Sequence, residues 1–317
     1  MSKISDTVLE KYQVRKNKKQ KAEFFDYVKS FSEERGYNCK TEKGSLGAKN
    51  IVVGDPDSAK VVYTAHYDTC PVLPFPNFIT PKKFSLYLLY QLVLVIGIIA
   101  IMVTASFVLG FTVGTVTAFL NLSEEATYAI GRITWYVIYF GVLILLFAGP
   151  ANKHTANDNT SGVVTLLEIM DKLPCELKND VAFVFFDLEE MGLFGSSGFA
   201  SKHKKAMKDK LLINFDCVSD GDNILLALKK QAEKYRPVIE KSFASNDLFK
   251  VDIRSKGVFY PSDQIHFKYG VGVAALKHSK YLKTEYMDRI HTKKDVIFYD
   301  ANIDFLVNCA VSLAGKL

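Results

Sequence analysis

Two long stretches of this sequence contain no charged residue. One runs from Phe84 to Ser123 and the other from Ile133 to Asn152. A transmembrane helix needs about 20 predominantly apolar residues, so either stretch is long enough to cross a bilayer. A pair of buried core helices is the alternative, but a soluble core rarely needs so long a run without one charge. We therefore expect a membrane-spanning hairpin insert at residues 84–151, with spans near residues 84–110 and 132–150.

The chain also lacks the features of an exported, disulfide-bonded protein. Its first stretch, MSKISDTVLEKYQVRKNKKQ, has neither the apolar core nor the small-residue cleavage site of a signal peptide. The five cysteines show no CxxC spacing, which indicates reduced thiols rather than a disulfide framework. We therefore expect no export of residues 1–83. The formal net charge of +6 is modest and needs no nucleic-acid partner to explain it.

Outside the uncharged stretches, short β-rich runs alternate with amphipathic helical ones. The runs KVVYTAHYD and DVAFVFFDLEE are rich in β-branched and aromatic residues and predict buried strands. SGVVTLLEIMDKL, which lies between them, predicts a helix. This alternation is typical of a mixed α/β fold with a largely parallel central sheet flanked by helices. We expect one such domain in two parts, residues 1–83 and 152–317, interrupted by the hairpin.

Two polar residues end the first of these predicted strands. His66 and Asp68 lie two positions apart in TAHYDT, so both side chains would point to one face of the strand. An imidazole in this position can bind a metal ion while the carboxylate hydrogen-bonds to its second ring nitrogen. The HxD pattern alone is a weak signal, and a structural histidine is the simpler interpretation.

Carboxylates follow two further predicted strands. FFDLEEMGLFG places Glu189 and Glu190 in a glycine-containing turn, and the strand INFD ends in Asp216. Open α/β sheets have their ligand sites at these carboxyl ends of the strands. Asp158 in NDNTSG precedes a predicted helix, where it could cap the helix, coordinate a metal ion or do both. IHTKKDV supplies His291 late in the chain.

Each of these motifs could by itself be a cap, a turn or a solvated charge. Together they supply two histidines and several carboxylates, which is the inventory of a two-metal hydrolytic site. In the order HYD, DNTSGV, EEMGLFGS, INFD and IHTKKD, they resemble the zinc aminopeptidases of metallopeptidase family 28, which includes bacterial leucyl aminopeptidases and the related glutaminyl cyclases. The resemblance covers nearly all of the chain apart from the insert and the amino-terminal segment.

The resemblance implies two divalent metal ions, expected to be Zn²⁺, and five residues that bind them. These are Asp158 as the bridge, His66 and Asp216 at one ion, and Glu190 and His291 at the other. Glu189 would be the general base, and Asp68 would orient His66. A cis peptide bond would join Asp158 to Asn159.

One motif departs from the family pattern. The family often has SDHxxF, whereas this chain has SDQIHF, with Gln264 in place of the histidine and His266 two positions further on. No metal ligand is lost by this change. A tyrosine near this motif can stabilise the oxyanion in some members, and Tyr260 is the candidate here.

The insert constrains the membrane topology because His66 and Asp158 flank it and must reach the same metal pair. Ions in such sites lie about 3.5–4 Å apart, so both residues must lie on one side of the membrane and the number of crossings between them is even. By length the insert could hold three helices, but parity favours two. Lys82, Lys83 and Lys153 flank it. The positive-inside rule therefore predicts a cytoplasmic catalytic domain, with the hairpin loop on the opposite side.

The expected function is that of a membrane-anchored two-metal aminopeptidase acting on peptides with a free amino terminus. The bilayer is the second expected partner, and small residues in TASFVLGFTVG could let the hairpin form oligomers. A single-zinc glutaminyl cyclase and a catalytically silent membrane binding protein on the same fold are the alternatives. Peptidases of the dimeric carboxypeptidase type also use HxD and EE signatures. They usually insert a lid domain, for which the segment between Asp216 and His291 leaves little room.

Overall fold

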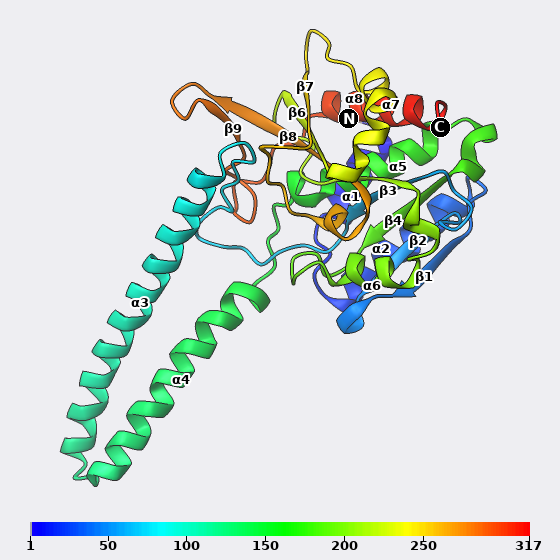
Figure 1. The fold of residues 1–317 in the computed structure, drawn as a ribbon. Helices are drawn as coiled ribbons and strands as arrows, with labels where there is room; N and C mark the ends of the chain where they lie inside the picture. The colour runs from blue at the N-terminus through cyan, green and yellow to red at the C-terminus, as the bar shows by residue number, and fades with distance from the viewer. Residues whose placement is uncertain (1) are drawn as a thin grey trace. The chain divides into compact units, whose positions relative to one another are not determined.

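A nine-stranded mixed sheet organises the larger of two compact units in the chain (Figure 1). This computed structural model describes residues 2–317. The larger unit contains Met1–Phe84 and Ala151–Leu317, and the smaller one contains Ser85–Pro150. Every strand of the sheet belongs to the larger unit, so two segments far apart in the sequence build one sheet.

The sheet contains parallel strands in its middle and antiparallel pairs on either side. Its strands are β1 (Cys39–Lys43), β2 (Lys49–Val53), β3 (Val61–His66), β4 (Val181–Phe186), β5 (Leu211–Phe215), β6 (Asn223–Leu228), β7 (Lys250–Arg254), β8 (Tyr269–Ser279) and β9 (Thr284–Tyr286). Their order is β1-β2-β4-β3-β5-β8-β6-β7, with β9 paired to β8. The neighbours β4, β3, β5 and β8 run parallel, whereas β2 and β6 pair antiparallel with β4 and β8. This arrangement confirms the predicted mixed α/β class with a largely parallel centre.

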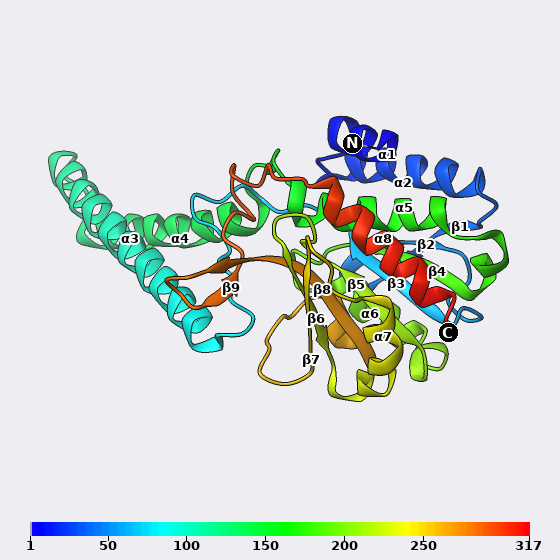
Figure 2. The same ribbon diagram turned by 90° about the horizontal axis from the view of Figure 1, so that it is seen from above.

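Helices cover both faces of this sheet (Figure 2). They are α1 (Lys3–Lys11), α2 (Lys18–Glu33), α5 (Gly162–Lys172), α6 (Phe194–Lys202), α7 (Arg236–Ser242) and α8 (Asp300–Ala314). On one face, α2, α5 and α8 pack over a core that includes Phe24, Leu166 and Leu306, while α6 covers the other face through Phe199. Alternate residues of β3 belong to the two cores, as the two-residue period of a strand requires. Shorter helical turns lie at Ser45–Gly47, Ala156–Ser161, Cys175–Asp180, Ala206–Lys208, Lys230–Tyr235 and Asp263–His266.

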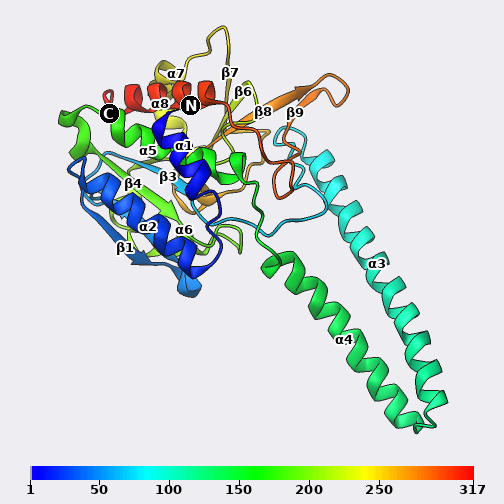
Figure 3. The same ribbon diagram turned by 180° about the vertical axis from the view of Figure 1, so that it is seen from behind.

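The smaller unit is a helical hairpin of α3 (Phe84–Phe119) and α4 (Glu124–Ala148) (Figure 3). Both helices are longer than the spans predicted at residues 84–110 and 132–150. The start of α4 has a clear cause, because the Ser123 side chain accepts a hydrogen bond from the N–H of Ala126 and caps the helix. Two glutamates in the first turn further favour this start by their interaction with the helix dipole. By length and composition, both helices could cross a membrane.

Candidate metal centre

The parallel strands bring the candidate residues to one edge of the sheet. His66 is the last residue of β3, Asp216 directly follows β5, and Glu189 and Glu190 lie in the turn after β4. Because β3 pairs in parallel with both β4 and β5, the carboxyl ends of these three strands meet at the same edge. His291 comes from the loop between β9 and α8.

Asp158 lies at the centre of this cluster, and its two carboxylate oxygens face different histidines. Its Oδ1 atom lies 3.3 Å from Nε2 of His66, and its Oδ2 atom lies 3.2 Å from Nε2 of His291. The same nitrogen of His66 lies 3.5 Å from Oδ1 of Asp216. Nε2 of His291 lies 3.3 Å from Oε2 of Glu190. The side chains therefore form two groups that share Asp158.

The donor set fits divalent cations. When zinc bonds of about 2.0–2.1 Å are arranged tetrahedrally, two ligand atoms lie roughly 3.3 Å apart, close to the separations around Asp158. Each of the two groups has its possible ligand atoms within 4.8 Å of one another. Oε1 of Glu190 is buried and has no hydrogen-bond partner among the described residues. Because a buried carboxylate oxygen is rarely left unpaired, its position also fits a cation.

Hydrogen bonds from two sides hold Asp158 in position. The carboxylate of Asp295 accepts the backbone N–H groups of Asp158, at 3.0 Å, and of the preceding residue, at 2.8 Å. The Asn159 side chain ties this segment to the end of β5, since it donates to the C=O of Phe215 at 3.0 Å and accepts from the N–H of Cys217 at 3.2 Å. The peptide bond between Asp158 and Asn159 is cis, as the resemblance implies. Helix α5 begins only at residue 162, so Asp158 does not cap it.

Asp68 lies behind His66 and also holds the turn that carries the two glutamates. Its carboxylate accepts the backbone N–H of Glu189 at 3.0 Å and that of Glu190 at 3.3 Å. Nδ1 of His66 lies 3.2 Å from the backbone oxygen of Asp68 and 3.7 Å from its carboxylate. The nearest partner of Nδ1 is therefore the carbonyl of Asp68, and the carboxylate of the same residue also positions the two glutamates.

Burial and crowding shift the pKa values of the groups in this cluster. Burial acts to lower the pKa of His291, but the charges of Glu190 and Asp158 outweigh it and raise the pKa to about 9. Burial raises the pKa of Glu190 to about 8, although His291 acts in the opposite direction. Burial also raises the pKa of Glu189 well above its usual range. A bound cation would favour the ionised carboxylates, because it places positive charge beside them.

A small pocket of about 60 Å³ opens onto these side chains. Its lining includes Glu189 and Tyr260, together with Asn77 and Ile79 from the segment that leads into α3. The N–H of Asn77 donates to the C=O of Ile290 at 3.3 Å, which fixes this segment beside the loop that carries the second histidine. The segment that leads into the hairpin therefore forms part of the wall of the site.

Comparison with known proteins identifies the family. The family model described as "Peptidase family M28" matches residues 142–311, which is more than half of the sequence. This chain belongs to peptidase family M28. The match begins within α4, so it does not include His66 and Asp68. A search of curated proteins found no match.

Solved structures with a similar fold include both peptidases and cyclases. The LapA aminopeptidase of Legionella pneumophila has a TM-score of 0.57 and 13% sequence identity, over 99% of this chain and 68% of that chain. A glutaminyl cyclase of Porphyromonas gingivalis has a TM-score of 0.58 and 13% identity, over 98% of each chain. A Zn-dependent exopeptidase from Parabacteroides distasonis has a TM-score of 0.56 and 14% identity, over 98% of this chain and 94% of that chain. At these identities, the similarity establishes the M28 fold alone.

The segment SDQIHF, which departs from the M28 pattern, has a structural role here. Gln264 is buried and donates from Nε2 to the C=O of Tyr260 at 2.6 Å, while His266 is exposed. The hydroxyl of Tyr260 donates to the backbone oxygen of Asp216 at 2.9 Å. This hydrogen bond holds Tyr260, the candidate for oxyanion stabilisation, at the wall of the pocket.

The sequence motifs of this M28 protein do not predict two residues that lie beside the site, and the first is Arg15. It precedes α2, whose start is fixed by a capping box between Asn17 and Gln20. Its side chain is fully buried and donates from Nε to the C=O of Tyr67 at 2.6 Å. Burial lowers the pKa of Arg15 to about 10, although the charge of Asp68 acts to raise it. No local pattern marks this arginine as a buried residue beside the site.

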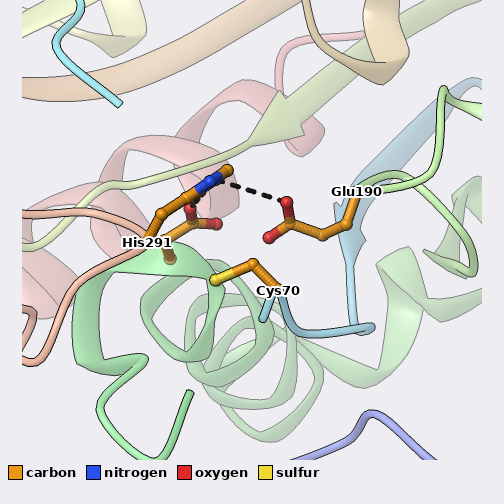
Figure 4. Close-up of side chains that lie close together, drawn as sticks. Cys70, Glu190 and His291 are labelled. Carbon is orange, nitrogen blue, oxygen red and sulfur yellow. Dashed lines mark ion pairs between the residues drawn. The ribbon is translucent and has the colours of Figure 1, made fainter. Parts of the chain in front are cut away.

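The second residue is Cys70, whose side chain lies beside Glu190 and His291 (Figure 4). Its sulfur belongs to one group of possible metal ligands with these two residues and Asp158. The signal was present in the sequence, because the thiol follows the HYD motif by two positions in HYDTC. The absence of CxxC spacing bears on disulfides and structural zinc sites, and it does not exclude a single thiol as a ligand.

Proposed function

We propose that this protein is a two-metal aminopeptidase of family M28, anchored in a membrane by the α3–α4 hairpin. The observation that carries the proposal is the bridging position of Asp158, with one oxygen facing His66 and the other facing His291. Asp216 would complete the first ligand set and Glu190 the second. Imidazole and carboxylate ligands suit Zn²⁺. A Zn-dependent exopeptidase among the similar structures agrees with this choice.

The residues around the pocket account for the hydrolysis of a peptide bond. When bound, the two ions supply Lewis acidity to the scissile carbonyl and to the attacking water. Glu189 lines the pocket and lies close to His66 and Glu190, and because the two ligand sets named above are complete without it, we assign its carboxylate to accept a proton from the water. It then returns this proton to the leaving amine as the C–N bond breaks. Asp68 holds the backbone N–H of Glu189 at 3.0 Å and so fixes the position of this base.

The dimensions of the pocket support an exopeptidase. The pocket beside the proposed ligands is small, at about 60 Å³, and we infer that it receives the amino-terminal end of a peptide. The proposed substrates are therefore peptides with a free amino terminus, from which one residue is removed at a time.

The hairpin helices support the membrane anchor. Their threonine hydroxyls donate to backbone C=O groups one turn back, as seen for Thr104, Thr112, Thr115, Thr117 and Thr134. These bonds would satisfy the hydroxyls inside a bilayer, but Thr7 and Thr165 of the larger unit form the same bonds, so the support for the anchor comes from the apolar length of the two helices. Lys82, Lys83 and Lys153 flank the hairpin and favour a cytoplasmic catalytic unit, with the loop between α3 and α4 on the opposite side. Substrates would then be peptides released at the cytoplasmic surface of the bilayer.

Metal content and substrate preference test the proposal together. The purified protein and its Glu189→Gln variant are compared on aminoacyl and blocked peptides, with Glu176→Gln, at an exposed position, as the control. We expect two metal ions per protein molecule and hydrolysis of free amino termini only. The rate should fall about 10²–10⁴-fold in Glu189→Gln, with the metal retained, because only the proton acceptor is removed. One ion with cyclisation of amino-terminal glutamine would identify a glutaminyl cyclase, and no ion at all would indicate a silent binding protein.

A further inference from the structure

Cys70 lies beside one half of the proposed metal centre (Figure 4). Its sulfur and the possible ligand atoms of Asp158, Glu190 and His291 all lie within 4.8 Å of one another. The residue is only 1% exposed, so the thiol faces this cluster rather than solvent. His66 ends β3 and Cys70 lies in the short segment that follows, so this part of the chain brings one donor to each half of the centre.

A second observation at the same place concerns Glu190. Its side chain is 8% exposed, and its Oε2 atom lies 3.3 Å from Nε2 of His291. The other carboxylate oxygen, Oε1, is buried and has no hydrogen-bond partner within residues 2–317. In Figure 4 the carboxylate of Glu190 points into the space between Cys70 and His291. A buried oxygen without a partner is costly unless a cation or a donor satisfies it, and no donor among the described residues reaches Oε1 of Glu190.

We propose that the thiolate of Cys70 is the fourth protein ligand of the ion held by Asp158, Glu190 and His291. This inference rests on the proposed function, which supplies the metal pair. One sulfur, one nitrogen and two oxygens make a complete tetrahedral set for zinc. The thiol proton is released to solvent when the ion binds, because the thiolate is the form that coordinates.

The protonation of the thiol depends on the ion. A divalent ion bound here would hold the thiol of Cys70 as the thiolate, because a coordinating thiol is deprotonated outright. The ligand charges then cancel those of the ions, since three carboxylates and one thiolate oppose the charge of two divalent cations.

Ligation by Cys70 makes the two halves of the centre unequal. The ion near Cys70 has four protein ligands, the number that is typical of closed structural sites. The other ion would be held by His66, Asp158 and Asp216, and three protein ligands with an open position are typical of catalytic zinc. A thiolate also favours Zn²⁺ and Co²⁺ over the harder Mn²⁺ and Mg²⁺.

X-ray absorption at the zinc edge tests this ligand directly. The full-length protein is purified in detergent and loaded with zinc, and the wild type is compared with Cys70→Ser and Cys217→Ser. In the wild type we expect a sulfur shell at about 2.3 Å beside nitrogen and oxygen at about 2.0–2.1 Å. Cys70→Ser should lose the sulfur shell. Cys217→Ser should keep it, because Cys217 is buried near the same site but belongs to no ligand group within the described residues.

Each outcome of this measurement either supports or overturns the assignment of Cys70 as a zinc ligand. A wild-type shell of nitrogen and oxygen alone overturns the ligand assignment, whatever the variants do, and so does sulfur that persists in Cys70→Ser. A protein that binds no zinc overturns the metal centre itself, which is a separate failure of the proposed function. As a second readout, a chelator titration should remove one zinc equivalent from Cys70→Ser at a chelator concentration at least about tenfold lower than from the wild type.

Discussion

Individual side chains in this protein position other side chains rather than acting alone. Asp295 accepts two backbone N–H groups next to the carboxylate of Asp158, and Asp68 accepts the N–H groups of both glutamates. Both carboxylates are buried, so each forms strong hydrogen bonds that fix a loop at the end of a strand. Geometry at the centre therefore depends on residues that do not line the pocket.

Asp295 provides a test of this dependence. Replacing it with alanine removes the acceptor for the two N–H groups, and the segment that carries Asp158 should lose its fixed position. We expect the zinc affinity of Asp295→Ala to fall about 10–100-fold, as for other residues that orient metal ligands. Asp295→Asn should show a smaller loss, because the amide oxygen can still accept. Zinc binding is measured by competition with a chelator.

A control variant shows whether a loss of zinc affinity is specific to Asp295 or follows the removal of any carboxylate. Asp304→Asn changes an exposed carboxylate on α8 that pairs with Lys172 at the surface, and it should bind zinc as the wild type does. Equal zinc affinity in Asp295→Ala and Asp304→Asn would show that Asp295 does not position Asp158.

Among the elements, the hairpin of α3 and α4 is separable from the sheet. No strand lies within Ser85–Pro150, and β3 and β4 pair with each other although the hairpin comes between them in the sequence. The segments next to the hairpin are tied to the larger unit, since Pro71 forms an isolated bridge with Ala151 and Ile79 forms another with Met287. These contacts do not depend on the hairpin helices, so the sheet and the centre are expected to survive without them.

Replacing residues 85–150 with a flexible Gly-Ser linker tests this separation. The full-length protein should remain in membranes after an alkaline carbonate wash, because its two apolar helices are held in lipid. The shortened protein should be soluble without detergent and still bind zinc. A full-length protein that the wash releases would contradict the membrane anchor. A soluble shortened protein that binds no zinc would instead show that the hairpin is needed to form the site.

Over the whole molecule, buried charges link elements that are distant in the sequence. Glu42 of β1 is buried beside the end of α6, where it accepts from Lys202 at 2.8 Å and lies 2.9 Å from Nε2 of His203. Burial acts to raise the pKa of Glu42, but the hydrogen bonds from Lys202, His203 and Lys40 outweigh it and lower the pKa to about 2. The ionised form therefore stabilises the folded protein.

The lowered pKa predicts how stability depends on pH. An ordinary glutamate has a pKa of 4.5, so unfolding favours protonation of Glu42 at acid pH. Its contribution should be complete above about pH 5 and should be lost progressively as the pH falls from 4.5 towards 2. Glu42→Gln should lower the midpoint of thermal unfolding at pH 7, and by less at pH 3. A difference that is the same at both pH values, or is matched by Glu176→Gln, would rule out this linkage.

Much of the fold and of the candidate site could be predicted from the sequence, because the hydropathy patterns and motifs that indicate them lie within short segments of the chain. The alternation of β-rich and amphipathic runs predicts the mixed sheet, and the uncharged runs predict two long apolar helices. His66, Asp158 and His291 each stand in a recognisable motif, and the structure brings them together. Their roles as ligands are part of the proposed function.

Only the tertiary structure decided which groups lie beside the carboxylate of Asp158 and what surrounds them. Arg15, Cys70 and Gln264 show the reason, because each has contacts with residues far away in the sequence that no local pattern encodes. The limits of the hairpin helices also differ from the predicted spans, since hydropathy marks apolar length but Ser123 decides where α4 begins. The sequence by itself determined the types of residue at the strand ends and the order of the elements. Their distances depend on the parallel pairing of β3, β4 and β5, which forms only when the whole sheet assembles.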